Sequence, residues 1–133
     1  MAARGSVLIL EDDPIICELL ECVFADDGHH VRVCSTPDQL LDVAGELPSA
    51  LAVVDFWGNG HQELAGEERD QFTRLTRAVP TILITGRAWA DRETGDELGL
   101  VAIVKKPFDV FDLTGLVSDL AARLSSEGTA ARR

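Results

Sequence analysis

The chain has 133 residues, of which 46 % are hydrophobic and 26 % are charged, the composition of one ordinary folded domain. Its formal net charge of −11 argues against nucleic acid or an anionic membrane surface as a direct partner, because both attract positive charge. The sequence shows no signal peptide and no apolar run of about 18 residues or more, so we expect a cytoplasmic protein.

Five short apolar segments recur along the chain and are predicted to be strands. Most are near-continuous runs of valine, isoleucine and leucine, as expected for parallel strands covered on both faces, whereas the second alternates and suits an edge strand. In chain order the segments are SVLIL (6–10), HVRVC (30–34), ALAVV (50–54), TILIT (81–85) and LVAIV (100–104).

Segments with helical spacing of apolar residues fill the intervals between these strands. In the second of them, Ser35 or Thr36 is a candidate cap, and a proline is admissible in the first turn. Strand and helix therefore alternate five times, which predicts an α/β fold with a parallel sheet and helices on both faces. The expected helices are residues 14–25, 35–47, 63–78, 88–98 and 110–124.

Polar side chains gather where the predicted strands end. In open parallel sheets, ligands bind outside the carboxyl ends of the strands, near the point where the strand order reverses. A cluster of ionised carboxylates at that place needs a cation, and hard oxygen ligands favour Mg²⁺. The residues at these ends are Glu11, Asp12 and Asp13 after the first strand, Asp55 after the third, Thr85 at the end of the fourth, and Lys105 and Lys106 after the fifth.

A bound metal would allow Asp55 to act as a nucleophile toward a phosphoryl group and to form an aspartyl phosphate. The added oxygens then need counter-charge and hydrogen-bond donors, which Mg²⁺, the Lys106 ammonium and the Thr85 hydroxyl can supply. This chemistry also explains why an acidic chain places a lysine where a buried strand ends, since Lys106 would neutralise the carboxylate or the phosphoryl group attached to it.

Taken in order, these motifs resemble those of a response-regulator receiver domain of two-component signalling. The matching features are the acid pair after the first strand, Asp55 after the third, Thr-Gly after the fourth and Lys-Pro-Phe after the fifth. The resemblance covers about residues 5–125 and implies a flavodoxin-like, three-layer fold with a five-stranded parallel sheet in the order 2-1-3-4-5. We assign residues 1–125 to the domain and residues 126–133 to a short, polar, frayed tail.

The resemblance implies a role for each matched residue. Asp55 would be the phosphoacceptor, and Lys106, in place of Lys105, matches the lysine of the family. Asp13 lies one place too late for the acid pair, so we expect it to cap a helix or to lie in a solvated loop. The implied metal ligands are Glu11, Asp12, Asp55 and the backbone carbonyl of Trp57.

Three departures from the family pattern bear on function. The loop after the third strand lacks the usual proline and carries Gly58 and Gly60. Ile103 stands where the family often has a switch aromatic, and the chain has no tyrosine, so the usual ring rotation cannot operate. Trp57 and Arg87 occupy positions that tune reaction rates in this family, where they could shield the acyl phosphate or pair with an anion, or merely pack locally.

The motifs therefore predict a stand-alone receiver that takes a phosphoryl group from a histidine kinase or a histidine phosphotransfer protein. It would signal through a downstream protein target, without direct contact to nucleic acid or membrane, and a homodimer through a helix face stays open. Such a domain catalyses its own phosphorylation and dephosphorylation but is not an enzyme in the usual sense.

Two alternatives stay open. The first is a degenerate receiver that binds proteins without phosphorylation, which the missing loop proline and switch aromatic favour and the intact acidic residues, threonine and lysine oppose. The second is a small phosphohydrolase of the haloacid-dehalogenase type, which also forms an aspartyl phosphate with Mg²⁺. That family has Asp-x-Asp after the first strand, whereas here Asp12 is followed two places on by Pro14.

Overall fold

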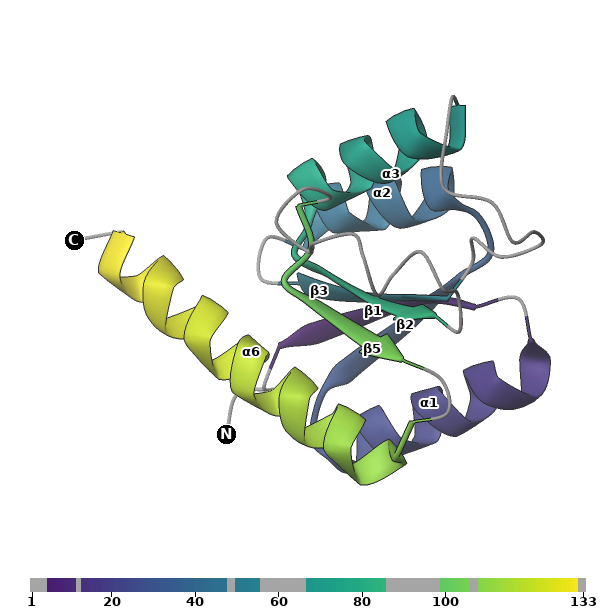
Figure 1. The fold of residues 1–133 in the computed structure, drawn as a ribbon. Coiled ribbons are helices and arrows are strands. Elements are labelled where there is room, and N and C mark those ends of the chain that lie inside the picture. Colours follow the sequence, from purple (N-terminus) through teal and green to yellow (C-terminus); the bar gives the residue numbers. More distant parts are fainter. Residues whose placement is uncertain are drawn as a thin grey trace.

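A computed structural model of the protein describes residues 5–11, 13–47, 50–55, 67–85, 99–105 and 108–131. Strands and helices alternate through most of these ranges (Figure 1). In chain order they are β1 (Ser6–Glu11), α1 (Pro14–Asp26), β2 (His30–Cys34), α2 (Pro37–Glu46), β3 (Ala50–Asp55), α3 (Glu67–Ala78), β4 (Thr81–Thr85), β5 (Ala102–Lys105) and α6 (Val110–Ala131). The predicted helix at residues 88–98 lies outside the described residues.

The five strands form one parallel sheet in the order β2-β1-β3-β4-β5, which confirms the predicted fold class and strand order. The alternating segment, β2, is an edge strand, as its pattern indicated. Each of β1 and β3 continues one residue further than predicted, so Glu11 and Asp55 are the last residues of their strands. The fifth strand begins and ends later than predicted, and Lys105 is its last residue.

Two hydrophobic clusters hold helices against the two faces of the sheet. Because successive residues of a strand point to opposite faces, β1 sends Val7 and Ile9 to one cluster and Leu8 and Leu10 to the other. The first cluster packs against α1 and α6, and the second against α2 and α3, which gives three layers (Figure 1). All four β1 side chains are 0 % exposed, and fully burying a side chain of this size contributes about 1.5–3 kcal/mol.

Side-chain caps start the first two helices. Asp13 is the N-cap of α1, where its Oδ1 accepts hydrogen bonds from the Ile15 and Ile16 amides at 2.9 and 3.4 Å. Thr36 is the N-cap of α2, and its Oγ1 accepts from the Gln39 amide at 3.1 Å. The capping role predicted for Asp13 is therefore confirmed, and Thr36 is the cap in place of Ser35.

The last helix corrects one expectation. It was predicted to end at residue 124, followed by a frayed tail at 126–133, but α6 continues to Ala131. The prediction ended the helix at Leu124, the last residue of its apolar periodicity, yet no proline follows to stop the backbone from continuing. Within the part of the chain that the structure describes, no helix is long and apolar enough to cross a membrane.

Candidate functional site

The register of the sheet brings two predicted site residues side by side. Glu11 of β1 and Asp55 of β3 are direct partners across adjacent parallel strands. One strand further along, Val54 pairs with Leu83, which places Thr85 at the same edge, close to the level of Asp55. Thr85 in turn pairs with Lys105 of β5. The carboxyl ends of β1, β3, β4 and β5 therefore form one polar rim, as the sequence predicted.

The side chains at this rim are shielded from water to different extents. Glu11 is 9 % exposed and Thr85 is 4 % exposed, while Asp55 is half-buried. The Oε1 atom of Glu11 accepts a hydrogen bond from the Asp13 amide at 2.9 Å, which fixes the carboxylate at the start of α1. Both Oε2 of Glu11 and Oδ2 of Asp55 are buried.

This pair of carboxylates fits a divalent cation. Two anionic oxygen ligands on adjacent strands repel each other, and Mg²⁺ prefers one or two carboxylates together with water and phosphate oxygens. Within the described residues no group of three or more His, Cys, Asp or Glu side chains could hold a metal ion. The third expected side-chain ligand, Asp12, lies outside those residues, as do Trp57, Arg87 and Lys106, whose roles stay predictions.

Ile103, at the predicted switch position, lies in β5 opposite Leu83 of β4. Its side chain is partly buried against the cluster beneath α2 and α3. It therefore contributes to packing on that face of the sheet.

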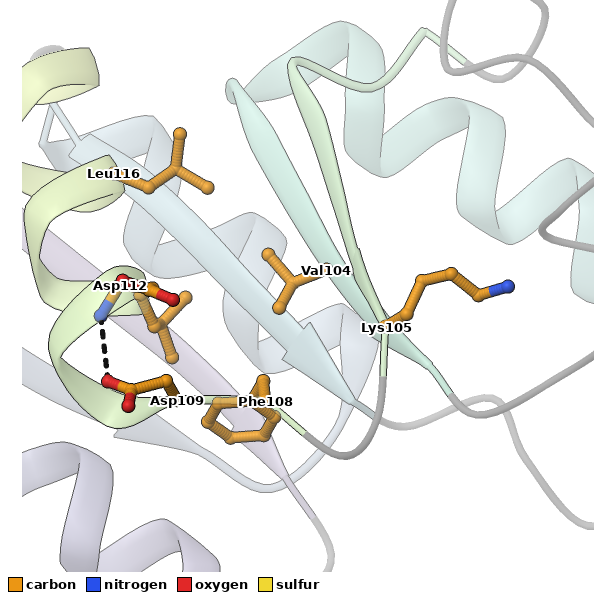
Figure 2. A pocket seen from close by; sticks show the side chains of 7 residues that line it. Val104, Lys105, Phe108, Asp109, Asp112 and Leu116 are labelled. Carbon is orange, nitrogen blue, oxygen red and sulfur yellow. Dashed lines mark hydrogen bonds between the residues drawn. The ribbon is translucent and has the colours of Figure 1, made fainter.

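A groove that the sequence did not indicate lies between β5 and the first turns of α6 (Figure 2). Its volume is about 290 Å³. Asp109 is part of its wall, but Oδ1 of this residue already accepts from the Phe111 and Asp112 amides at 2.8 and 3.2 Å and so serves to cap α6. Figure 2 shows Lys105 extending away from Asp109 and Asp112, so the groove does not bring these charges together. The lining residues are Val104, Lys105, Phe108, Asp109, Asp112, Leu113 and Leu116.

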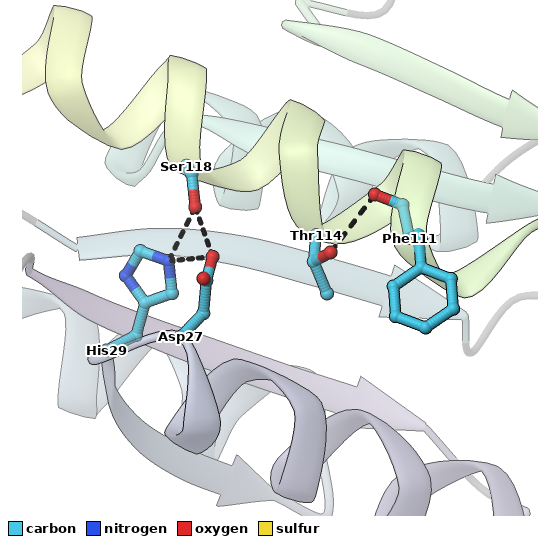
Figure 3. Close-up of polar contacts among 5 residues, drawn as sticks. All are labelled: Asp27, His29, Phe111, Thr114 and Ser118. Carbon is cyan, nitrogen blue, oxygen red and sulfur yellow. Dashed lines mark hydrogen bonds and ion pairs between the residues drawn. The ribbon is translucent and has the colours of Figure 1, made fainter.

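A second feature absent from the prediction is a polar cluster that joins the turn between α1 and β2 to α6 (Figure 3). Ser118 Oγ donates a hydrogen bond to Asp27 Oδ2, and the Nε2 atom of buried His29 lies 3.4 Å from Ser118 Oγ and 3.8 Å from Asp27 Oδ2. The His29 ring also meets Phe24 edge to face, with centroids 6.5 Å apart. Because serine and aspartate both approach Nε2, the cluster lacks the geometry of a catalytic triad, and it instead fastens α6 to the turn that follows α1.

Comparison with known proteins points to one class. No family model matches the chain. It is 30 % identical over 128 residues to the uncharacterized transcriptional regulatory protein YkoG of Bacillus subtilis, covering 95 % of this chain and 54 % of that protein. The chain spans about half the length of the curated relatives that it matches.

Two solved structures that resemble this chain are receiver domains of response regulators. The receiver domain of the TMAO respiratory system response regulator TorR is 25 % identical, with a TM-score of 0.72 over 90 % of this chain and 98 % of that one. A CheY-like receiver domain protein from Methanospirillum hungatei, 18 % identical, has a TM-score of 0.69 over 92 % of this chain and 98 % of that one. At that identity, the second likeness shows the shared fold.

Proposed function

The chain belongs to the receiver domains of response regulators, and we propose that it takes a phosphoryl group from a phosphohistidine onto Asp55, with Mg²⁺ as cofactor. The observation that carries this proposal is the pairing of Glu11 with Asp55 at the carboxyl edge of the sheet, with buried Thr85 at the end of the neighbouring strand. Glu11, Asp12, Asp55 and the Trp57 carbonyl would hold the metal.

The residues of the chain divide the work of the transfer. An Asp55 carboxylate oxygen forms a bond to phosphorus while the bond from phosphorus to the donor imidazole breaks, and the imidazole leaves. When bound, Mg²⁺ supplies positive charge for the phosphoryl oxygens. Thr85 donates its hydroxyl hydrogen to one of these oxygens, and Lys106 supplies a second positive charge. Glu11, held by the Asp13 amide, keeps its carboxylate at the metal position.

We further propose that the donor is a histidine kinase or a histidine phosphotransfer protein and that the output is contact with a protein target. The relatives include proteins named as transcriptional regulators, but this domain carries a net charge of −11, which disfavours its own contact with nucleic acid. Protein partners with basic or polar surfaces suit that charge better.

A degenerate receiver remains a second candidate because of one observation. Ile103 is partly buried against one core cluster at the position where an aromatic switch would stand, so ring rotation cannot carry a phosphorylation signal to the surface. In that case the fold would bind its partner in the unmodified state.

Intact-mass measurement separates these two functions. The parent, Asp55→Asn and the control Asp26→Asn, whose carboxylate is exposed on α1, are each incubated with acetyl phosphate, with and without Mg²⁺. We expect a metal-dependent gain of one phosphoryl group in the parent and in the control, and none in Asp55→Asn. No gain in the parent, repeated with a competent phosphohistidine donor, would instead support the degenerate receiver.

A further inference from the structure

Asp13 joins the end of β1 to the start of α1 through three of its own groups. Its amide donates a hydrogen bond to Glu11 Oε1 at 2.9 Å. On the helix side, its Oδ1 accepts from the Ile15 and Ile16 amides, and its carbonyl accepts from the Cys17 amide at 2.9 Å. One residue therefore holds both the first turn of α1 and the carboxylate of Glu11.

The direction of the Asp13 amide depends on the cap that its side chain makes. Asp13 has φ −87° and ψ 114°, an extended conformation that is typical of an N-cap residue. In this conformation the side chain reaches forward to the first amides of the helix, while the Asp13 amide donates back to Glu11. Without the side-chain oxygen, those helix amides need water as acceptor and the first turn can fray. The Asp13 amide would then lose its fixed direction toward Glu11.

The cap of α2 shows what is unusual at α1. Thr36 Oγ1 accepts from the Gln39 amide at 3.1 Å, and Gln39 Oε1 accepts from the Ser35 amide at 2.7 Å, so this arrangement closes on the start of its own helix. At α1 the position equivalent to Gln39 is Ile16, whose side chain cannot accept a hydrogen bond. The acceptor is instead Glu11, at the end of the strand. A predicted metal ligand thus takes the place of a helix side chain.

Glu11 needs such support because of where it lies. It is 9 % exposed and is the direct partner of Asp55 across the strands. The two carboxylates repel each other, so without a metal Glu11 is favoured to turn away toward water. The hydrogen bond from the Asp13 amide opposes this movement and keeps Oε1 at the start of α1, with Oε2 buried.

We propose that Asp13 is a positioning residue of the metal site, which acts through its cap on α1 to keep the Glu11 carboxylate in place for Mg²⁺. This role rests on the proposed function, because it assigns Glu11 to the metal, and it adds a coupling between metal binding and the first turn of α1. Such a coupling is reciprocal, so bound Mg²⁺ in turn stabilises that turn.

Calorimetric titration with Mg²⁺ compares the parent with Asp13→Ala and Asp13→Asn. Alanine removes the cap, and loss of one cap typically changes a population ratio about fivefold, so we expect Mg²⁺ to bind about fivefold more weakly. Asparagine is an equally good cap without the charge, so its affinity should stay within about twofold of the parent. Thr36→Ala, which removes the matched cap on α2, should lower the stability of the fold and leave the affinity for Mg²⁺ unchanged.

Amide hydrogen exchange tests the positioning without the metal. The amide at position 13 should exchange slowly in the parent and in Asp13→Asn, and faster in Asp13→Ala. Addition of Mg²⁺ to the parent should slow exchange at Ile15, Ile16 and Cys17.

The outcomes separate this role from the proposed function. Equal Mg²⁺ affinity or equal exchange at position 13 in Asp13→Ala and the parent would overturn the positioning role alone. So would an affinity of Asp13→Asn as weak as that of Asp13→Ala, since the charge and not the cap would then be responsible. No Mg²⁺ binding by the parent would contradict the proposed function and this role with it.

Discussion

Replacement of Glu11 by glutamine tests the metal site while keeping the shape of the side chain. Glu11 and Asp55 pair across strands that lie about 4.8 Å apart. Unit charges at that distance interact by about 3 kcal/mol at an effective dielectric constant of about 20. Glu11 attracts Mg²⁺ by at least this magnitude, but replacing it also relieves its repulsion of Asp55, so we take about half of this value as the net contribution of Glu11 to Mg²⁺ binding. The expected loss of affinity is therefore about tenfold.

Urea unfolding with and without Mg²⁺ measures this loss. At a Mg²⁺ concentration about ten times the Kd of the parent, binding should stabilise the parent by about 1.4 kcal/mol and Glu11→Gln by about 0.4 kcal/mol. The amide oxygen of glutamine can still accept the hydrogen bond from Asp13, so the local backbone should keep its conformation. Glu18→Gln, an exposed change on α1, is the control and should respond like the parent. A gain of about 1.4 kcal/mol in Glu11→Gln as well would refute the reasoning.

Two further predictions concern packing and thiol reactivity. Phe24→Ala should lower the free energy of unfolding, measured in urea, by about 3–5 kcal/mol, because Phe24 is fully buried. Phe111→Ala should lower it far less, because Phe111 is exposed. Equal losses of stability in the two variants would contradict the packing described. With iodoacetamide at mildly alkaline pH, peptide mass spectrometry should find exposed Cys22 alkylated before Cys17 and Cys34, because burial raises the pKa of both of these thiols. Alkylation of Cys34 first would contradict this order.

Much of the fold could be read from the sequence because the strands are covered on both faces. Continuous runs such as residues 50–54 and 81–85 admit few other interpretations, and the alternation of residues 30–34 correctly indicated an edge strand. The end of α6 could not be read in this way. Apolar periodicity reports which residues pack against the sheet, and the backbone of α6 stays helical beyond the last of them.

The candidate site was predictable to the extent that it depends on strand ends. Glu11, Asp55 and Thr85 meet at one edge because the carboxyl ends of neighbouring parallel strands coincide. The contact between Asp27 and Ser118 joins residues 91 positions apart and follows no local motif, so only the tertiary structure reveals it. The exposure of Phe111 was hidden for a similar reason, since an apolar residue in a helix is usually taken to pack inward.

Chemical mapping of the phosphorylated residue tests the central claim most directly. After incubation with acetyl phosphate and Mg²⁺, borohydride reduction converts an aspartyl phosphate to homoserine, which tandem mass spectrometry can locate in a peptide. The phosphoacceptor function predicts homoserine at position 55 and at no other aspartate. Reduction at a different carboxylate, or phosphorylated protein with an intact Asp55, would contradict it.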